Sequence, residues 1–153
     1  MSQFEKTLIM LKPEAFRRNL VDKIISQFTS KGLKIVAART IDNPSRELLE
    51  LHYSSDEFIR LNKLHIRERV ITYCSSGRIM VVLFEGENAI ELVRKIIGDR
   101  NPRLSGPGTI RSCVDDSFED ADARGEAMRD LIHGPRSKEE AMRQIQLWFE
   151  EKV

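Results

Sequence analysis

The chain has 153 residues, of which 41% are hydrophobic and 32% are charged. That length fits one ordinary domain, and that balance excludes a disordered, collagen-like or coiled-coil chain. The 25 Lys and Arg residues are balanced by 24 Asp and Glu residues, so the net charge of +1 excludes a strong global field for binding nucleic acid or an anionic membrane. A local cluster of cations is therefore needed to bind any anionic ligand.

The sequence favours a cytoplasmic protein that does not bind membranes. No apolar run approaches the roughly 20 residues that a membrane span needs, and the N-terminus lacks the basic and then apolar pattern of a secretory leader. Cys74 and Cys113 lie far apart and lack the spacing of metal ligands. Two free thiols are typical of a reducing compartment.

The first half of the chain alternates between strand and helix patterns. Residues 6–11 form a nearly continuous apolar run, which is typical of a buried strand. Over residues 14–28, apolar side chains recur at helical spacing. Residues 33–41 favour a second strand, and the turn at residues 43–45 begins a second helix.

The middle of the chain continues this alternation. Residues 55–74 are charged and have helical spacing, with apolar residues on one side. Residues 79–84 give the strongest strand pattern of the chain. An amphipathic helix is predicted over residues 89–97, and Gly98 ends it.

The last third begins with an irregular segment. Residues 101–111 are dense in turn formers and too long for a simple connector, and such loops are often functional. An acidic segment follows, then a brief buried strand over residues 131–134 and a helix from Ser137. Three strands come early and one late, which favours an antiparallel α+β fold over a doubly wound parallel sheet.

Three polar residues stand at predicted strand ends beside Gly or Pro: Lys12, Arg111 and His133. Such positions place side chains at the rim of a sheet. A neutral imidazole can act as a nucleophile, a base or a metal ligand, so His133 is a candidate for chemistry. Each residue also has a structural interpretation: His133 as a satisfied core histidine, Lys12 as a solvated cation and the loop before Arg111 as a turn.

Five motifs together resemble the nucleoside diphosphate kinase family. They follow in the family's order and are Lys12-Pro13, Asn101-Pro102, Pro107-Gly108-Thr109-Ile110-Arg111, Ile132-His133-Gly134 and Trp148-Phe149. The resemblance implies one nucleoside diphosphate kinase-like domain over residues 1–153, with a ferredoxin-like βαββαβ core in which helices cover an antiparallel sheet. It also implies a homo-oligomer, either a hexamer or a tetramer, and magnesium-nucleotide chemistry.

The resemblance assigns roles to individual residues. His133 is the nucleophile that forms a phosphohistidine, as the γ-phosphoryl group of a nucleoside triphosphate passes to a nucleoside diphosphate in a ping-pong mechanism. Lys12 and Tyr53 lie nearest the transferring group, while Arg94 and Arg111 hold the phosphate tail. Mg²⁺ is expected mainly on the nucleotide phosphates, since no cage of carboxylates is visible in the sequence.

Five residues depart from the family pattern. Ala15 stands in place of a turn glycine, Pro135 in place of a serine, and Arg100 in place of a threonine that touches phosphate. Asp130 replaces an asparagine that binds ribose and phosphate. Gln144 stands where a carboxylate normally orients the histidine, so it can hold a tautomer but carries no charge to stabilise an imidazolium. A Gln144→Glu change is therefore expected to speed phosphorylation.

The departures leave alternatives open. The family's aromatic residues for stacking on the base are missing, so either Ile66 or Phe58 is expected to contact it. The alternative to a kinase is a nucleotide-binding or oligomeric interaction protein of the same fold with weak or lost kinase activity. A specific nucleic-acid binder is disfavoured, because the strands carry no alternating exposed aromatic residues of the kind that stack on bases.

Overall fold

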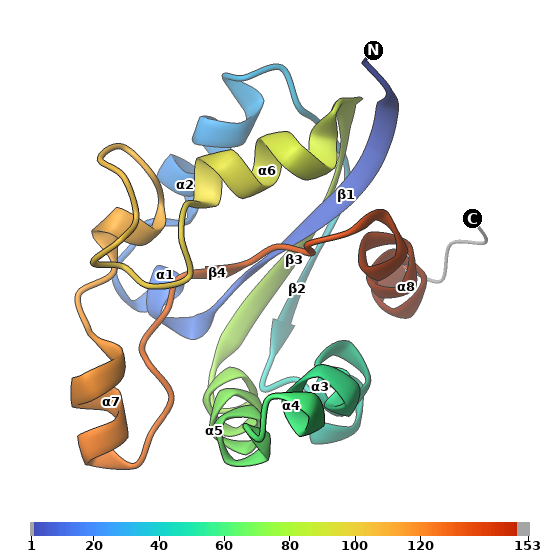
Figure 1. Cartoon of the computed structure of the whole chain (residues 1–153). Coiled ribbons are helices and arrows are strands. Elements are labelled where there is room, and N and C mark those ends of the chain that lie inside the picture. The colour runs from blue at the N-terminus through green and yellow to red at the C-terminus, as the bar shows by residue number, and fades with distance from the viewer. Residues whose placement is uncertain (1, 150–153) are drawn as a thin grey trace.

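A computed structural model describes residues 2–149 of the chain, apart from the side chains of residues 55 and 57. Four strands form one antiparallel sheet in the order β2-β3-β1-β4 (Figure 1). The strands are β1 (Phe4–Leu11), β2 (Lys34–Asp42), β3 (Arg78–Glu87) and β4 (Ile132–His133). The helices are α1 (Pro13–Arg17), α2 (Val21–Thr29), α3 (Arg46–His52), α4 (Ser55–Arg60), α5 (Leu64–Ser75), α6 (Ala89–Ile97), α7 (Phe118–Arg124) and α8 (Lys138–Phe149), with a short 3-10 helix η1 (Arg111–Cys113).

The two central strands, β1 and β3, are apolar on both of their faces. The side chains of residues 8–11 and 81–84 are all buried, and the two strands pair along the whole of β1. A strand that is covered on both faces has a continuous apolar run, because neither set of alternating side chains meets water. The predicted strands at residues 6–11 and 79–84 are confirmed.

Helices cover both faces of the sheet, so the chain has two apolar cores. One face carries Ile9 and Leu11 and packs against α1, α2 and α6. The other face carries Leu8 and Met10 and packs against α3, α5 and α8. Figure 1 shows α2 and α6 on one side of the sheet and α3, α4 and α5 on the other. The predicted antiparallel α+β fold is therefore confirmed.

The first helical segment differs from the single helix predicted over residues 14–28. It is divided into α1 and α2 at Asn19, whose φ is +59°. Asparagine tolerates this left-handed conformation better than most residues do. Beyond the break, Ile24 and Phe28 of α2 are buried in the core. An apolar repeat does not reveal a break of this kind, because both helices present the same spacing.

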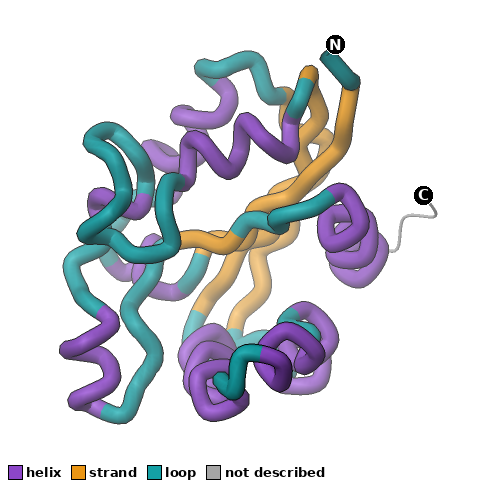
Figure 2. Tube along the Cα trace, viewed as in Figure 1, coloured by secondary structure: helices purple, strands orange, loops and turns teal. Residues whose placement is uncertain are grey.

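The long irregular segments between α6 and β4 lie beside one end of the sheet. Figure 2 shows the long loop between α6 and η1 there, close to the segment that leads into β4. Gly98 ends α6 with φ +91° and ψ −172°, a conformation essentially reserved for glycine. The loop then returns to the core at Ile110, which is buried and donates its backbone N–H to Ile96 O at 3.0 Å. The residue that follows, Arg111, is thereby fixed beside β4.

Strand β2 forms an edge of the sheet, and most of its residues are exposed. Two of its apolar residues, Ile35 and Val36, are 45% and 40% exposed. An edge strand with exposed apolar side chains is a place where another chain can pair with the sheet.

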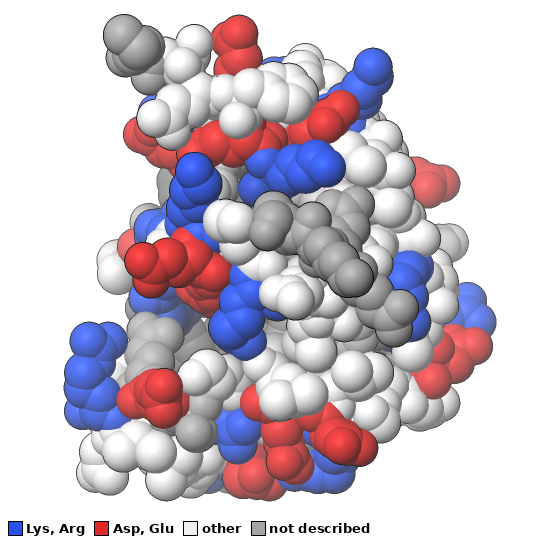
Figure 3. Space-filling view, turned by 90° about the vertical axis from the view of Figure 1, so that its right-hand side faces the viewer, with Lys and Arg blue, Asp and Glu red and all other residues white. Residues whose placement is uncertain are grey.

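The surface carries mixed charge. On the face seen in Figure 3, Lys and Arg side chains are interspersed with Asp and Glu side chains instead of gathering by sign. This distribution agrees with the net charge of +1. Within residues 2–149, the structure contains no helix that is both long and apolar enough to cross a bilayer.

Candidate active site

The candidate site lies where β1 ends beside β4. Met10 pairs with His133 and Leu11 with Ile132. Paired residues of an antiparallel ladder project to the same face of the sheet. His133 therefore lies on the Met10 face, toward α3, α5 and α8. A cleft of about 1590 Å³ opens at this point, and its lining includes Lys12, Tyr53 and His133.

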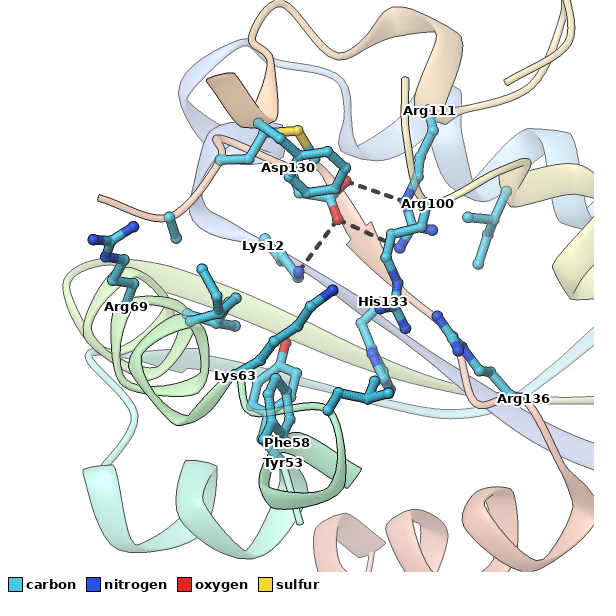
Figure 4. Close-up of a pocket in the computed structure, with 18 of the residues that line it drawn as sticks. Lys12, Tyr53, Phe58, Lys63, Arg69, Arg100, Arg111, Asp130, His133 and Arg136 are labelled. Atoms are coloured by element: carbon cyan, nitrogen blue, oxygen red, sulfur yellow. Dashed lines mark hydrogen bonds and ion pairs between the residues drawn. The ribbon is translucent and has the colours of Figure 1, made fainter. Parts of the chain in front are cut away.

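The predicted catalytic residues come together around His133. Its ring centroid lies 5.5 Å from that of Tyr53, and its Nε2 lies 3.2 Å from Gln144 Oε1. Lys12 Nζ lies 5.9 Å from the centroid of the Tyr53 ring. In the view of Figure 4, Asp130 lies above Lys12 and His133, while Tyr53 and Phe58 lie below them. The structure thus unites four residues that are widely separated in the sequence.

The end of α3 is held in place by two arginines. The last carbonyl groups of a helix have no partners within the helix, and cations near them are favourable. Arg67 of α5 donates to the backbone oxygen of Tyr53 at 2.7 Å, and Arg143 of α8 donates to that of His52 at 3.0 Å. These bonds fix the position of Tyr53 relative to the helices that cover this face of the sheet.

Three buried charges lie beside the histidine. Asp130 Oδ2 is 3.3 Å from Lys12 Nζ and 3.4 Å from an Arg111 side-chain nitrogen, and the three side chains are at most 14% exposed. Burial would raise the pKa of Asp130, but the charges of Lys12 and Arg111 outweigh it and hold that pKa below its usual value. Arg111 also donates to Ile132 O at 3.0 Å. The trio therefore joins the end of β1, the loop and β4.

The surroundings of His133 keep its ring neutral. Burial lowers its pKa to about 3, and the positive charges of Lys12 and Arg111 contribute to that decrease. Gln144 and Asp130 act in the opposite direction and are outweighed. A neutral imidazole has an electron pair available on one of its two ring nitrogens.

The partner of Nε2 determines which nitrogen holds that electron pair. Gln144 Oε1 can only accept a hydrogen bond, so His133 Nε2 donates its N–H to it over 3.2 Å. The electron pair then lies on Nδ1. Of the two ring nitrogens, Nδ1 is the one that can attack an electrophile.

Sequence reasoning missed His52, whose ring packs against that of His133. Its ring centroid is 4.6 Å from that of His133, and Trp148 Nε1 donates to its Nδ1 at 2.9 Å. Burial lowers the pKa of His52 well below its usual value, so this ring is also neutral. The only sequence clue that His52 belongs to the site was its position directly before Tyr53, at the end of a predicted helix. Burial similarly raises the pKa of Tyr53, so its hydroxyl keeps its proton and can donate it.

The remaining predicted site residues also line the cleft. Arg94 and Arg100 are exposed, and Arg94 donates to Arg136 O at 3.3 Å. Phe58 and Ile66 are both half-buried, and both line the cleft. The structure therefore brings both residues to the same cleft as His133.

Two of the departures from the family pattern have a structural explanation. Ala15 is buried within α1, a conformation that does not need glycine. Asp130 is balanced by Lys12 and Arg111, the two cations expected to bind phosphate.

Comparisons with known proteins agree with this geometry. The sequence profile described as nucleoside diphosphate kinase matches residues 5–153. A curated nucleoside diphosphate kinase from Methanocaldococcus jannaschii is 41% identical over 147 residues, covering 96% of this chain and 94% of that protein. One from Staphylococcus epidermidis is 39% identical over 145 residues, covering 95% of this chain and 87% of that protein. Nothing in these comparisons supports the alternative of an interaction protein with lost activity.

Solved structures give the same result. A transition-state mimic of the nucleoside diphosphate kinase from Borrelia burgdorferi, with bound vanadate and ADP, has a TM-score of 0.90 and 33% identity, covering 95% of this chain and 87% of that one. The kinase from Pyrobaculum aerophilum has a TM-score of 0.89 and 34% identity, covering 97% of both chains. The expected ferredoxin-like fold is thereby confirmed.

The low pKa of His133 predicts that its ring does not titrate near neutrality. The ring signals of His133 in nucleotide-free protein should stay unchanged in NMR spectra from pH 8 to pH 5, because the pKa is about 3. In a Lys12→Met variant the pKa should move upward, since one repelling charge is removed. A midpoint near the ordinary value of about 6.5 in the unaltered protein would contradict this account.

The position of Asp130 predicts opposite effects on stability and on binding. An Asp130→Asn variant should bind ADP about tenfold more tightly in calorimetric titrations, because Lys12 and Arg111 no longer share their charge with a carboxylate. Its free energy of unfolding, measured in urea, should fall by about 1–3 kcal/mol, since two buried cations lose their counter-charge.

The control is Asp122→Asn, which removes a carboxylate that pairs with Arg69 at the rim of the same cleft and is 72% exposed. Exposed pairs contribute at most about 1 kcal/mol, so this change should leave ADP affinity nearly unaltered. Weaker ADP binding in Asp130→Asn than in the unaltered protein would show that Asp130 does not compete with phosphate.

Proposed function

Because this chain belongs to the nucleoside diphosphate kinase family, we propose that it transfers the γ-phosphoryl group of a nucleoside triphosphate to a nucleoside diphosphate through a phosphorylated His133. The observation that carries this role for His133 is a neutral imidazole whose Nε2 is held by Gln144 beside two cations in a cleft. The two nucleotides use this cleft in turn, which is a ping-pong mechanism.

The first step forms one bond and breaks one. The electron pair of His133 Nδ1 attacks the γ-phosphorus, and the bond from that phosphorus to the bridging oxygen breaks. Its electrons leave with the nucleoside diphosphate. The proton on Nε2 stays in its hydrogen bond to Gln144, so the phosphorylated ring carries a positive charge. The second step reverses these changes with another diphosphate as acceptor.

The residues around His133 match the charge that phosphoryl transfer develops. Negative charge is spread over the oxygens of the transferring group, so fixed cations and hydroxyl donors stabilise it. We assign this role to Lys12 and to the neutral hydroxyl of Tyr53, whose ring centroid lies 5.5 Å from that of His133 and 5.9 Å from Lys12 Nζ. Arg94 and Arg111 hold the phosphate tail, and Arg100 adds positive charge at the same cleft.

Asp130 and the apolar residues bind the remaining parts of the nucleotide. Asp130 can accept from a ribose hydroxyl, although its charge also engages Lys12. Ile66 or Phe58 contacts the base, since both line the cleft. Contacts of this apolar kind are sequence-tolerant, because every base has an apolar face.

Kinase activity in this family requires a divalent cation, and we propose that the cation is Mg²⁺. Among the side chains that the structure describes, no group of three or more His, Cys, Asp or Glu residues could hold a metal. We propose that the ion is held mainly by the nucleotide phosphates, where it neutralises part of their negative charge. The protein's own residues then bind the phosphates directly.

We also propose that the chain forms a homo-oligomer, either a hexamer or a tetramer. The support from this structure is the exposed edge strand β2 with Ile35 and Val36. A cytoplasmic location is supported by the two cysteines, neither of which is in a disulfide within the described residues. We propose residues 1–153 as the extent of the kinase domain, supported by the profile match over residues 5–153.

The proposed function predicts a phosphorylated intermediate on one residue. Incubation with Mg²⁺ and ATP labelled in the γ-phosphate should give a phosphoprotein that is labile in acid and stable in alkali. Adding a second diphosphate, such as GDP, should move the label to GTP at about 1 per second or faster. Excess EDTA should prevent labelling.

A matched pair of variants tests whether His133 is the residue that becomes phosphorylated. His133→Ala should not become labelled, whereas His65→Ala should label as the unaltered protein does, because His65 is an exposed histidine of the same cleft. Equal labelling of His133→Ala and the unaltered protein would refute the mechanism.

A further inference from the structure

Two side chains, Gln144 and Glu140, stand in line behind the proposed nucleophile His133. We propose that Glu140 is a positioning residue for His133, which acts through the side-chain amide of Gln144. This inference rests on the proposed function, because it concerns the state in which His133 receives the phosphoryl group. Neither Gln144 nor Glu140 needs to touch the nucleotide for it to hold.

The hydrogen bonds leave only one arrangement of the Gln144 amide. Gln144 Nε2 lies 3.0 Å from Glu140 Oε1. A carboxylate only accepts, so the NH₂ group must face Glu140 and the amide oxygen must face His133. That oxygen lies 3.2 Å from His133 Nε2 and also only accepts. Glu140 therefore determines, through two bonds, that His133 carries its proton on Nε2.

Glu140 is itself fixed in position. It lies in the first turn of α8, four residues before Gln144, so the two side chains share one face of the helix. Its Oε2 accepts from the backbone N–H of Arg136 at 3.1 Å, while its own backbone N–H donates to Ser137 Oγ at 3.1 Å. The carboxylate thus has both oxygens engaged and cannot turn freely away from Gln144.

The charge of Glu140 also lies close to the ring. Its Oε1 is 3.9 Å from His133 Nε2, and its side chain is 28% exposed. Phosphorylation at Nδ1 leaves the ring with a positive charge, which a carboxylate at this distance favours. Gln144 carries no charge. Glu140 therefore supplies the negative charge that a carboxylate at position 144 would have provided.

This arrangement reverses the expectation that Gln144→Glu alone speeds phosphorylation. That variant would place a second carboxylate in contact with Glu140, at the distance of the present 3.0 Å hydrogen bond. Two carboxylates so close cannot both stay ionised without strong repulsion. Faster phosphorylation is expected only when Glu140 is replaced by an amide side chain at the same time, in the double variant Glu140→Gln with Gln144→Glu.

The test compares Glu140→Gln, Glu140→Ala and the double variant with the unaltered protein. Glu140→Gln keeps the shape of the side chain, so it separates positioning from loss of fold, which circular dichroism checks. The control is Glu139→Gln, because Glu139 precedes Glu140 on α8, is exposed, and loses the same charge.

The first measurement is the tautomer of His133 in nucleotide-free protein at neutral pH, from ¹⁵N NMR of labelled histidine. The unaltered protein and Glu139→Gln should show His133 protonated on Nε2 alone. Glu140→Gln and Glu140→Ala should show a mixture with the Nδ1 tautomer, since the Gln144 amide is then free to turn over. An unchanged tautomer in both variants overturns the proposal.

The second measurement is phosphorylation by ATP in a single turnover. Substituting a residue that orients a reacting group through another side chain typically alters activity by about 10- to 100-fold. The rate constant should fall by this amount in Glu140→Gln with the half-saturating ATP concentration nearly unchanged, and the double variant should regain at least the rate constant of the unaltered protein. A rise in the half-saturating ATP concentration with an unchanged rate constant would contradict a positioning role. So would a double variant that does not regain the lost rate. If the unaltered protein is not phosphorylated at all, the proposed function is refuted. The tautomer measurement does not depend on that function, because it uses nucleotide-free protein.

Discussion

The burial of Asp130 between two cations is the constraint on which the site depends. A carboxylate withdrawn from water is tolerated only when opposite charges and hydrogen bonds surround it. Lys12 follows β1, Arg111 follows the long loop, and Asp130 precedes β4, so the three side chains bring three distant segments to one point. Because two cations surround one carboxylate, this cluster of three side chains keeps an excess of positive charge. That excess lies beside His133, where burial is the main cause of the lowered pKa and the positive charges lower it further.

The two apolar cores make this arrangement rigid. Leu11 directly precedes Lys12 and is fully buried in one core, while Met10 opposite His133 is fully buried in the other. The cations are therefore held in place before any nucleotide arrives, and such preorganisation reduces the cost of ordering charged side chains during the reaction. We propose that the same pairing has a cost for binding, because a phosphate bound by these cations would share them with Asp130. Folding stability and nucleotide affinity would then be opposed at this single residue.

Part of the site could be predicted from the sequence, and the limit has a physical reason. Strand ends beside Gly or Pro identified Lys12, Arg111 and His133, and the family resemblance added Tyr53 and Gln144. Local patterns could not show that Lys12 pairs with a residue 118 positions away, since only the folded sheet brings the two together. The break at Asn19 was also hidden, because the apolar repeat continues across it. Glu140 could have been found from its four-residue spacing to Gln144, but the consequence of that spacing for His133 depends on the approach of β4 to α8.

The proposed mechanism requires that Gln144 holds Nε2 of His133 and leaves Nδ1 to attack. The most direct test is the identity of the phosphorylated ring nitrogen. Protein labelled with ¹⁵N-histidine and phosphorylated by ATP can be examined by ³¹P and ¹⁵N NMR under alkaline conditions, where phosphohistidine survives. We expect the phosphorus to be coupled to Nδ1 of His133. Phosphorus on Nε2 would mean that Gln144 does not hold that nitrogen during the reaction, which would contradict the proposed mechanism.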